Sequence, residues 1–178
     1  PMFTRSATRV ESIRSVPVLD ALAVVSLVVM TIVDAAVSSS HVRAASYAVA
    51  AVLVLGRTLH WGTRHALRVP LLWILHAGHA FIPIGLALRA LPVLVPVISD
   101  SAATHAFTVG AIGCTTLGMM SRVALGHTGR TLDVRAPMVV AFAAIVLAAI
   151  VRVVGPHMAV TYAPSLFLAG ALWTVAFG

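Results

Sequence analysis

Six long apolar runs constrain the fold of this 178-residue chain more than any other feature of its sequence. A helix needs about 20 apolar residues to cross the roughly 30 Å of hydrocarbon in a bilayer. Membrane barrels use shorter strands with alternating apolar and polar residues, and these runs show no such alternation. The sequence therefore predicts an all-α fold, a polytopic transmembrane helical bundle of about six spans in a single domain over residues 1–178. The expected spans are residues 17–37, 44–59, 70–91, 103–125, 136–154 and 157–178.

The composition supports a lipid environment and argues against other protein classes. Hydrophobic residues make up 60% of the chain and charged residues only 10%, whereas soluble domains average about 25% charged residues. The net charge of +7 comes from arginines scattered between the apolar runs, so nucleic-acid binding is not expected. The single cysteine, Cys114, excludes an internal disulfide, a CxxC metal motif and the attachment of a c-type haem.

The arginines also predict the orientation of the spans. Loops on the cytoplasmic side of a membrane protein carry an excess of positive charge. With six spans, three arginines fall on one side of the membrane: Arg43, Arg89 and Arg152. The other side receives Arg5, Arg9, Arg14, Arg57, Arg64, Arg68, Arg122, Arg130 and Arg135. The richer side is predicted to be cytoplasmic, with both chain termini on it.

Two histidines in the third expected span are candidate ligands of a metal or a haem iron. His76 and His79 are three residues apart, so they lie on one face of a helix. His79 is expected roughly 12 Å below the membrane surface, near the midplane. Ionisable residues at such depth are costly and often functional, and neutral imidazole is a common ligand. The competing interpretation is that the pair makes hydrogen bonds between helices.

The fourth expected span carries small residues at every fourth position. Ala106, Gly110, Cys114 and Gly118 form this small-residue stripe, which allows another group to approach the backbone closely. Another helix is the usual partner, but a flat macrocycle such as haem is compatible with the same face. The spacing thus predicts a close contact and leaves the identity of the partner open.

The remaining histidines are expected near the two membrane surfaces. One surface would hold His41, His105 and His157, and the other His60, His65 and His127. Either trio is able to gather copper, which imidazole suits, although loop histidines are usually just solvated. His79 and His105 are expected to differ in depth by roughly 18 Å. They are therefore not predicted to bind one iron together.

Arg122 closes the fourth span and has two interpretations. An arginine at the end of a span usually extends towards lipid phosphates, but its guanidinium also suits the carboxylates of haem propionates. The turn that follows would hold His127 at the same surface. The first span also carries two aspartates. Asp34 is expected to pair with Arg43, and the negative charge of Asp20 is expected to stabilise the N-terminus of its helix.

Several segments resemble the NnrS family. The resemblance is carried by residues 105–130, HAFTVGAIGCTTLGMMSRVALGHTGR, of which MSRVALGHTGR is the most specific part. The segments PLLWILH at 70–76, PIGL at 83–86 and PMFTR at 1–5 are also similar. On the basis of these motifs, the chain resembles members of that family.

The resemblance implies a multi-pass protein of the bacterial inner (cytoplasmic) membrane that binds b-type haem and copper. Such proteins act in the response to nitric oxide, in nitrosative stress or denitrification. His105, Arg122 and His127 match the family's motif block and His76 its earlier segment, whereas His79 is inferred from its position. The candidates for haem binding are therefore His76, His79, His105 and Arg122, and those for a metal are His76, His79, His105 and His127.

The resemblance also implies a longer protein and leaves other functions open. Family members have more spans, so the chain is expected to be the C-terminal part of a longer membrane protein, contacting a missing N-terminal half or another subunit. An enzyme that turns over nitric oxide is a second hypothesis, although no relay of acidic residues crosses the spans. The alternative is a cofactor-free transporter or channel module, because Pro83 and Pro164 are expected to interrupt their helices.

Overall fold

The fold was examined in a computed structural model that describes residues 16–132, 134–158 and 162–178. Within these residues all regular structure is helical, in agreement with the predicted class. The α-helices are α2 (Pro17–Ala36), α3 (Ser40–Leu59), α4 (Thr63–Ala66), α5 (Pro70–Ala90), α6 (Asp100–His105), α7 (Cys114–His127), α8 (Ala136–Val154) and α9 (Tyr162–Phe177). The other helical segments are η1 (Leu91–Val93), η2 (Ala106–Gly113) and η3 (Gly155–His157).

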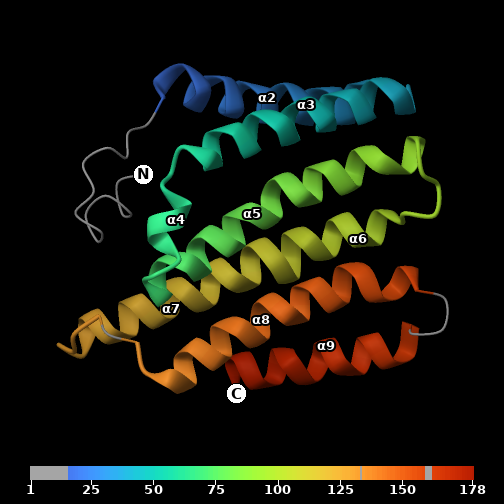
Figure 1. The fold of residues 1–178 in the computed structure, drawn as a ribbon. Coiled ribbons are helices and arrows are strands. Elements are labelled where there is room, and N and C mark those ends of the chain that lie inside the picture. Colours follow the sequence, from blue (N-terminus) through green and yellow to red (C-terminus); the bar gives the residue numbers. More distant parts are fainter. Residues whose placement is uncertain (1–15, 133, 159–161) are drawn as a thin grey trace.

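The long helices lie side by side and alternate in direction along the chain (Figure 1). The α2–α3 hairpin forms one edge of the bundle and the α8–α9 hairpin forms the other. Between them lie α5 and the continuous helical rod of α6, η2 and α7. A short connection containing α4 joins α3 to α5. This order places α5 at the centre of the molecule, where its side chains contact both edges.

Five helical stretches are long and apolar enough to cross a membrane by length and composition: Pro17–Ala36, Ser40–Leu59, Pro70–Val93, Asp100–His127 and Ala136–His157. The last apolar helix, Tyr162–Phe177, has 16 residues and is shorter than a typical span. The chain is therefore a helical membrane protein, and the sixth span remains a prediction. The second expected span, the shortest in sequence, extends over 20 residues as α3.

The described arginines gather at the two ends of the bundle in unequal numbers. Because the helices alternate in direction, one end holds Arg57, Arg64, Arg68, Arg122, Arg130 and Arg135. The opposite end holds Arg43, Arg89 and Arg152. The expected positions of Arg5, Arg9 and Arg14 lie outside the described residues. The asymmetry used to predict orientation is present, and the cytoplasmic assignment of the richer end stays a prediction.

The helix at the edge of the bundle exposes apolar surface. α2 buries one side chain completely, Ala23, while Val18 and Ile32 remain largely exposed. Large exposed apolar patches are unusual on soluble monomers, but they suit a helix that faces lipid. The centre differs, since α5, η2, α7 and α8 share one buried cluster that includes Ile74, Phe142 and Ile145.

The small-residue stripe packs against α5. A Cβ atom added at Gly110 would overlap the Phe81 side chain, and one added at Gly118 would lie 2.9 Å from Ile74 Cγ2. Across the same interface, a Cβ atom at Gly78 would lie 3.1 Å from the Cβ atom of Cys114. The prediction that another helix packs against the small-residue stripe is therefore confirmed at these positions. Side chains of α5 occupy the space beside the stripe that a macrocycle would need.

The prolines do not interrupt the helices as expected. Pro83 is buried within α5, which continues from Pro70 to Ala90. Pro164 lies in the first turn of α9, where its missing N–H group is tolerated. The irregular element is instead η2, eight residues wound as a π-helix, and such segments often occur at functional sites. The expectation of two broken helices was wrong because one proline is accommodated in a helix and the other begins one.

Candidate metal and cofactor site

His76 and His79 lie in the first half of α5, on the side of its midpoint that is nearer the arginine-rich end of the bundle. Both precede Pro83 and point towards the connection between α3 and α4. His76 is 8% exposed, and His79 is partly buried. The helical spacing that placed the two imidazoles on one face is borne out by their contact with a common neighbour.

That neighbour is Trp61, which follows the end of α3. Its indole ring lies 4.2 Å from the His79 ring between centroids, with an interplanar angle of 31°. The same indole meets the His76 ring edge-on, at 6.1 Å and 84°. The two imidazoles therefore border one indole surface and belong to one site, which we call the His76–His79 site.

A hydroxyl group from the next segment contacts the first of the two imidazoles. Thr63 Oγ1, at the start of α4, lies 3.1 Å from His76 Nδ1. When the ring nitrogen donates this hydrogen bond, the lone pair of the imidazole is on Nε2. Metal-binding histidines commonly use one ring nitrogen in this way to orient the other. Thr63 thus fixes the direction of the His76 ring.

Two ring nitrogens of the site are buried without a hydrogen-bond partner among the described residues. They are His79 Nε2 and Trp61 Nε1. A buried polar atom left unpaired costs about 1–3 kcal/mol, so such atoms usually have a partner. An imidazole nitrogen accepts a hydrogen bond or binds a metal with the same lone pair. The orphaned Nε2 atom is the feature of this site that best fits a ligand.

An arginine connects the site to the edge of the bundle. The Arg57 Cζ atom lies 4.9 Å from the centroid of the Trp61 ring, within range of a cation–π interaction. Its Nε atom donates a 2.7 Å hydrogen bond to Asp20 Oδ1 of α2. The contacts continue from Asp20 through Arg57 and Trp61 to His79. Sequence reasoning placed Asp20 at the start of its helix, which is correct, but missed this ion pair.

The Asp20–Arg57 pair gives a first prediction. We expect a double-mutant cycle with Asp20→Asn and Arg57→Gln to show a coupling free energy of about 1 kcal/mol, because the hydrogen bond is short but both side chains are about one-third exposed. Thermal unfolding in detergent measures it. The matched control is Asp34 and Arg43, a pair at 4.0 Å, for which the coupling should be smaller. Equal coupling in the two pairs would contradict this reasoning.

The other predicted site residues lie elsewhere. His105 ends α6 at the opposite end of the bundle. Arg122 lies in α7, one turn beyond Gly118, and is partly buried. His127 is the last residue of α7 and is exposed. His105 is therefore separated from the His76–His79 site, whereas Arg122 and His127 share its end of the bundle.

The two histidine trios do not form metal sites. Among the described residues, no three His, Cys, Asp or Glu side chains are placed to hold one metal ion. Two of the histidines have structural partners instead. Ser99 donates its backbone N–H to His157 Nε2 at 3.2 Å, and His60 Nδ1 lies 2.9 Å from the Gly56 carbonyl oxygen. The possibility that either trio gathers copper is therefore not supported, and the interpretation of these histidines as separate surface residues agrees with the structure.

The His76–His79 site fits the imidazole ligands of a metal or a haem iron only in part. It supplies one orphaned ring nitrogen and a second imidazole on the same indole surface. A third ligand is not found among the described residues. The stripe on the α6–α7 rod, which was open to a macrocycle in sequence, is filled by α5. The described residues therefore supply two candidate ligands.

Comparisons with known proteins give one match. No curated protein and no solved structure shows a significant match to this chain. The sequence profile of a family described as NnrS protein matches residues 1–178, which is the whole chain. This agrees with the motifs at residues 70–86 and 105–130. The chain belongs to the NnrS family.

Proposed function

We propose that this protein binds haem and copper in the bacterial inner membrane and acts in the response to nitric oxide. Two observations support the proposal. The first is that the chain belongs to the NnrS family, whose members are described as haem- and copper-binding membrane proteins. The second is that the buried His79 Nε2 atom has no partner among the described residues. The second observation is the basis for proposing particular side chains as ligands.

In this proposal, His79 and His76 are the ligands that the chain contributes. A haem iron or copper held there would supply a centre that binds nitric oxide. Trp61 excludes water from one side of the His79 imidazole by stacking on it. Thr63 orients His76 through its hydrogen bond, and Arg57 holds the indole in place from α3. The remaining ligands would come from the longer protein of which we propose this chain is the C-terminal part.

Turnover of nitric oxide and cofactor-free transport have weaker support. Reduction of nitric oxide consumes protons, which an acidic side chain near the site would supply. Asp20 is connected to the His76–His79 site only indirectly, through Arg57 and Trp61. Transport was suggested by two broken helices, but Pro83 lies within a continuous α5 and Pro164 in the first turn of α9. We therefore propose binding of the cofactors as the function that the site supports best.

The test is cofactor binding by the full-length protein with His79→Ala. We expect the variant to lose at least tenfold in affinity for haem or for copper, because a coordinate bond is removed and loss of a hydrogen-bond partner of a metal ligand alone costs about 10- to 100-fold. Soret absorption after haem supplementation measures the first cofactor, and elemental analysis measures the second. His60→Ala is the matched control, since His60 is exposed beyond the end of α3 and its Nδ1 atom lies 2.9 Å from the Gly56 carbonyl oxygen.

Three outcomes decide the question. Loss in His79→Ala with normal binding in His60→Ala supports the proposed ligand. Unchanged binding of both cofactors in His79→Ala would remove His79 from the site. A parent protein that takes up neither haem nor copper would overturn the proposed function itself.

A further inference from the structure

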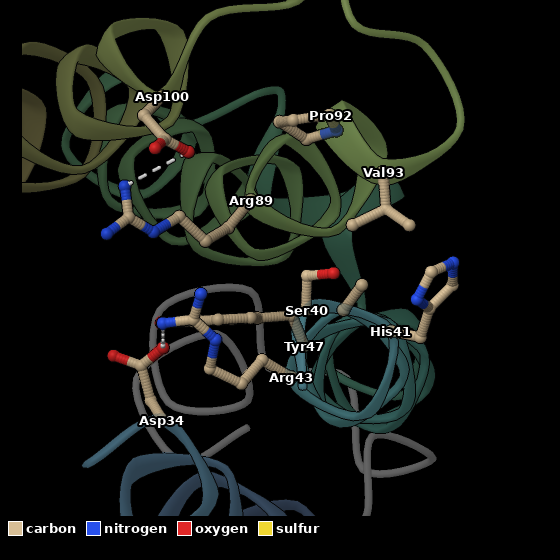
Figure 2. Close-up of a pocket in the computed structure, with 10 residues that line it drawn as sticks. Asp34, Ser40, His41, Arg43, Tyr47, Arg89, Pro92, Val93 and Asp100 are labelled. Carbon is tan, nitrogen blue, oxygen red and sulfur yellow. Dashed lines mark ion pairs between the residues drawn. The ribbon is translucent and has the colours of Figure 1, made fainter. Parts of the chain in front are cut away.

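A second polar site lies at the opposite end of the bundle from the His76–His79 site. A pocket of about 420 Å³ opens between the α2–α3 hairpin and the connection from α5 to α6 (Figure 2). Because α3 begins and α5 ends there, the pocket is at the surface of the bundle and reachable from water. Its polar lining includes Asp34, Arg43, Tyr47, Arg89 and Asp100.

The pocket holds two loosely paired guanidinium groups. Arg43 of α3 lies 4.0 Å from Asp34, and Arg89 of α5 lies 3.4 Å from Asp100. Charge-assisted hydrogen bonds usually measure about 2.7–2.9 Å, as the Arg57 contact at the other end does at 2.7 Å. Figure 2 shows the two arginine side chains entering the pocket from different helices. Neither carboxylate therefore saturates its guanidinium group.

The hydrogen-bonding groups of the pocket have an excess of donors. Each guanidinium has five N–H donors and no acceptor. The Nε atom of Arg43 is buried and has no partner among the described residues. Tyr47 lies on the same wall, but its single O–H group is directed to Asp34 and its oxygen accepts from Arg89, so it adds no spare donor. Asp34 and Asp100 balance the formal charge of the two arginines, but guanidinium N–H groups that lack a partner still need a hydrogen-bond acceptor, and an anionic acceptor forms the stronger bond.

We propose that this pocket binds a small planar oxyanion of single charge, such as nitrite, nitrate or a short carboxylate. Planar anions with two adjacent oxygens match the fork of a guanidinium group. Asp34 and Asp100 border the pocket, so an anion with two or more charges is disfavoured by repulsion. In this proposal the pocket prefers one negative charge, with Arg43 and Arg89 as the binding residues.

The experiment titrates the full chain in detergent with nitrite, nitrate and formate at constant ionic strength. Calorimetry measures the binding. We expect saturable binding in the parent and at least tenfold weaker binding in Arg43→Gln, because a charge-assisted contact is lost. Tyr47→Phe keeps every charge and should weaken binding by less. Arg152→Gln is the matched control: it removes an arginine from the same end of the bundle, but outside the pocket.

The outcomes separate a built site from general electrostatics. Loss in Arg43→Gln with normal binding in Arg152→Gln supports the proposal, and an equal loss in Arg89→Gln supports it if Arg43→Gln does not fold, whereas unchanged binding in Arg89→Gln would then overturn it. Equal loss in Arg152→Gln, tighter binding of phosphate than of nitrite, or no saturable binding by the parent would overturn it. His79→Ala should leave anion binding unchanged, so failure of the oxyanion site is distinguishable from failure of the proposed cofactor function.

Discussion

Replacement of Gly110 by alanine is expected to destabilise the protein by several kcal/mol or to prevent folding. Gly110 lies in the π-helical segment η2, and the Phe81 side chain of α5 fills the space where a Cβ atom would be. The nearest atoms include the Cβ and Cγ atoms of Phe81, which are close to its backbone and have little freedom to move. Overpacking in a tight interior typically costs about 1–3 kcal/mol, and here the two central helices would have to separate.

The measurement is the melting temperature of purified protein, together with the yield of monodisperse protein in detergent. Gly126→Ala is the matched control, because a Cβ atom there meets nothing within 4 Å and the residue lies in α7. Alanine in a helix is favoured over glycine by about 1 kcal/mol, so this variant should be neutral or slightly more stable. A Gly110→Ala variant that melts with the parent would show that α5 does not pack against η2 as described.

Replacement of Phe142 by alanine is expected to lower the free energy of unfolding by about 2 kcal/mol, less than the roughly 3–5 kcal/mol typical of soluble cores. Phe142 is fully buried in α8, and its ring meets Trp73 of α5 edge-on at 5.9 Å. In a bilayer the unfolded side chain also contacts apolar tails, so the transfer of the ring from water contributes little. The lost packing and the cavity remain.

The control for Phe142 is another phenylalanine with the opposite environment. Phe167 of α9 is 81% exposed, and Phe167→Ala should change stability in lipid by less than about 0.5 kcal/mol. Unfolding in bicelles or nanodiscs, followed by tryptophan fluorescence, compares the two variants. If Phe167→Ala were as costly as Phe142→Ala, the exposed face of α9 would be packed against protein rather than lipid.

The amino-acid sequence determined the features that depend on local composition and helical spacing. Apolar runs of sufficient length predicted the helices, since hydrocarbon requires a backbone that satisfies its own hydrogen bonds. The three-residue spacing of His76 and His79 placed both on one face, and four-residue spacing predicted the stripe through Gly110. Family motifs at residues 105–130 indicated the family that matches the whole chain.

Only the tertiary structure decided which distant segments meet. Trp61 comes 15 residues before His76, and no local pattern links it to α5. Likewise, nothing in the sequence around Asp20 indicates Arg57, and the histidine trios expected at the surfaces do not converge. Hydrophobicity along a chain specifies that a helix forms and crosses the bilayer, whereas the rotation of each helix about its axis depends on packing against its neighbours. That rotation brings the two histidines to Trp61 at one end of the bundle, and Arg43 and Arg89 to one pocket at the other.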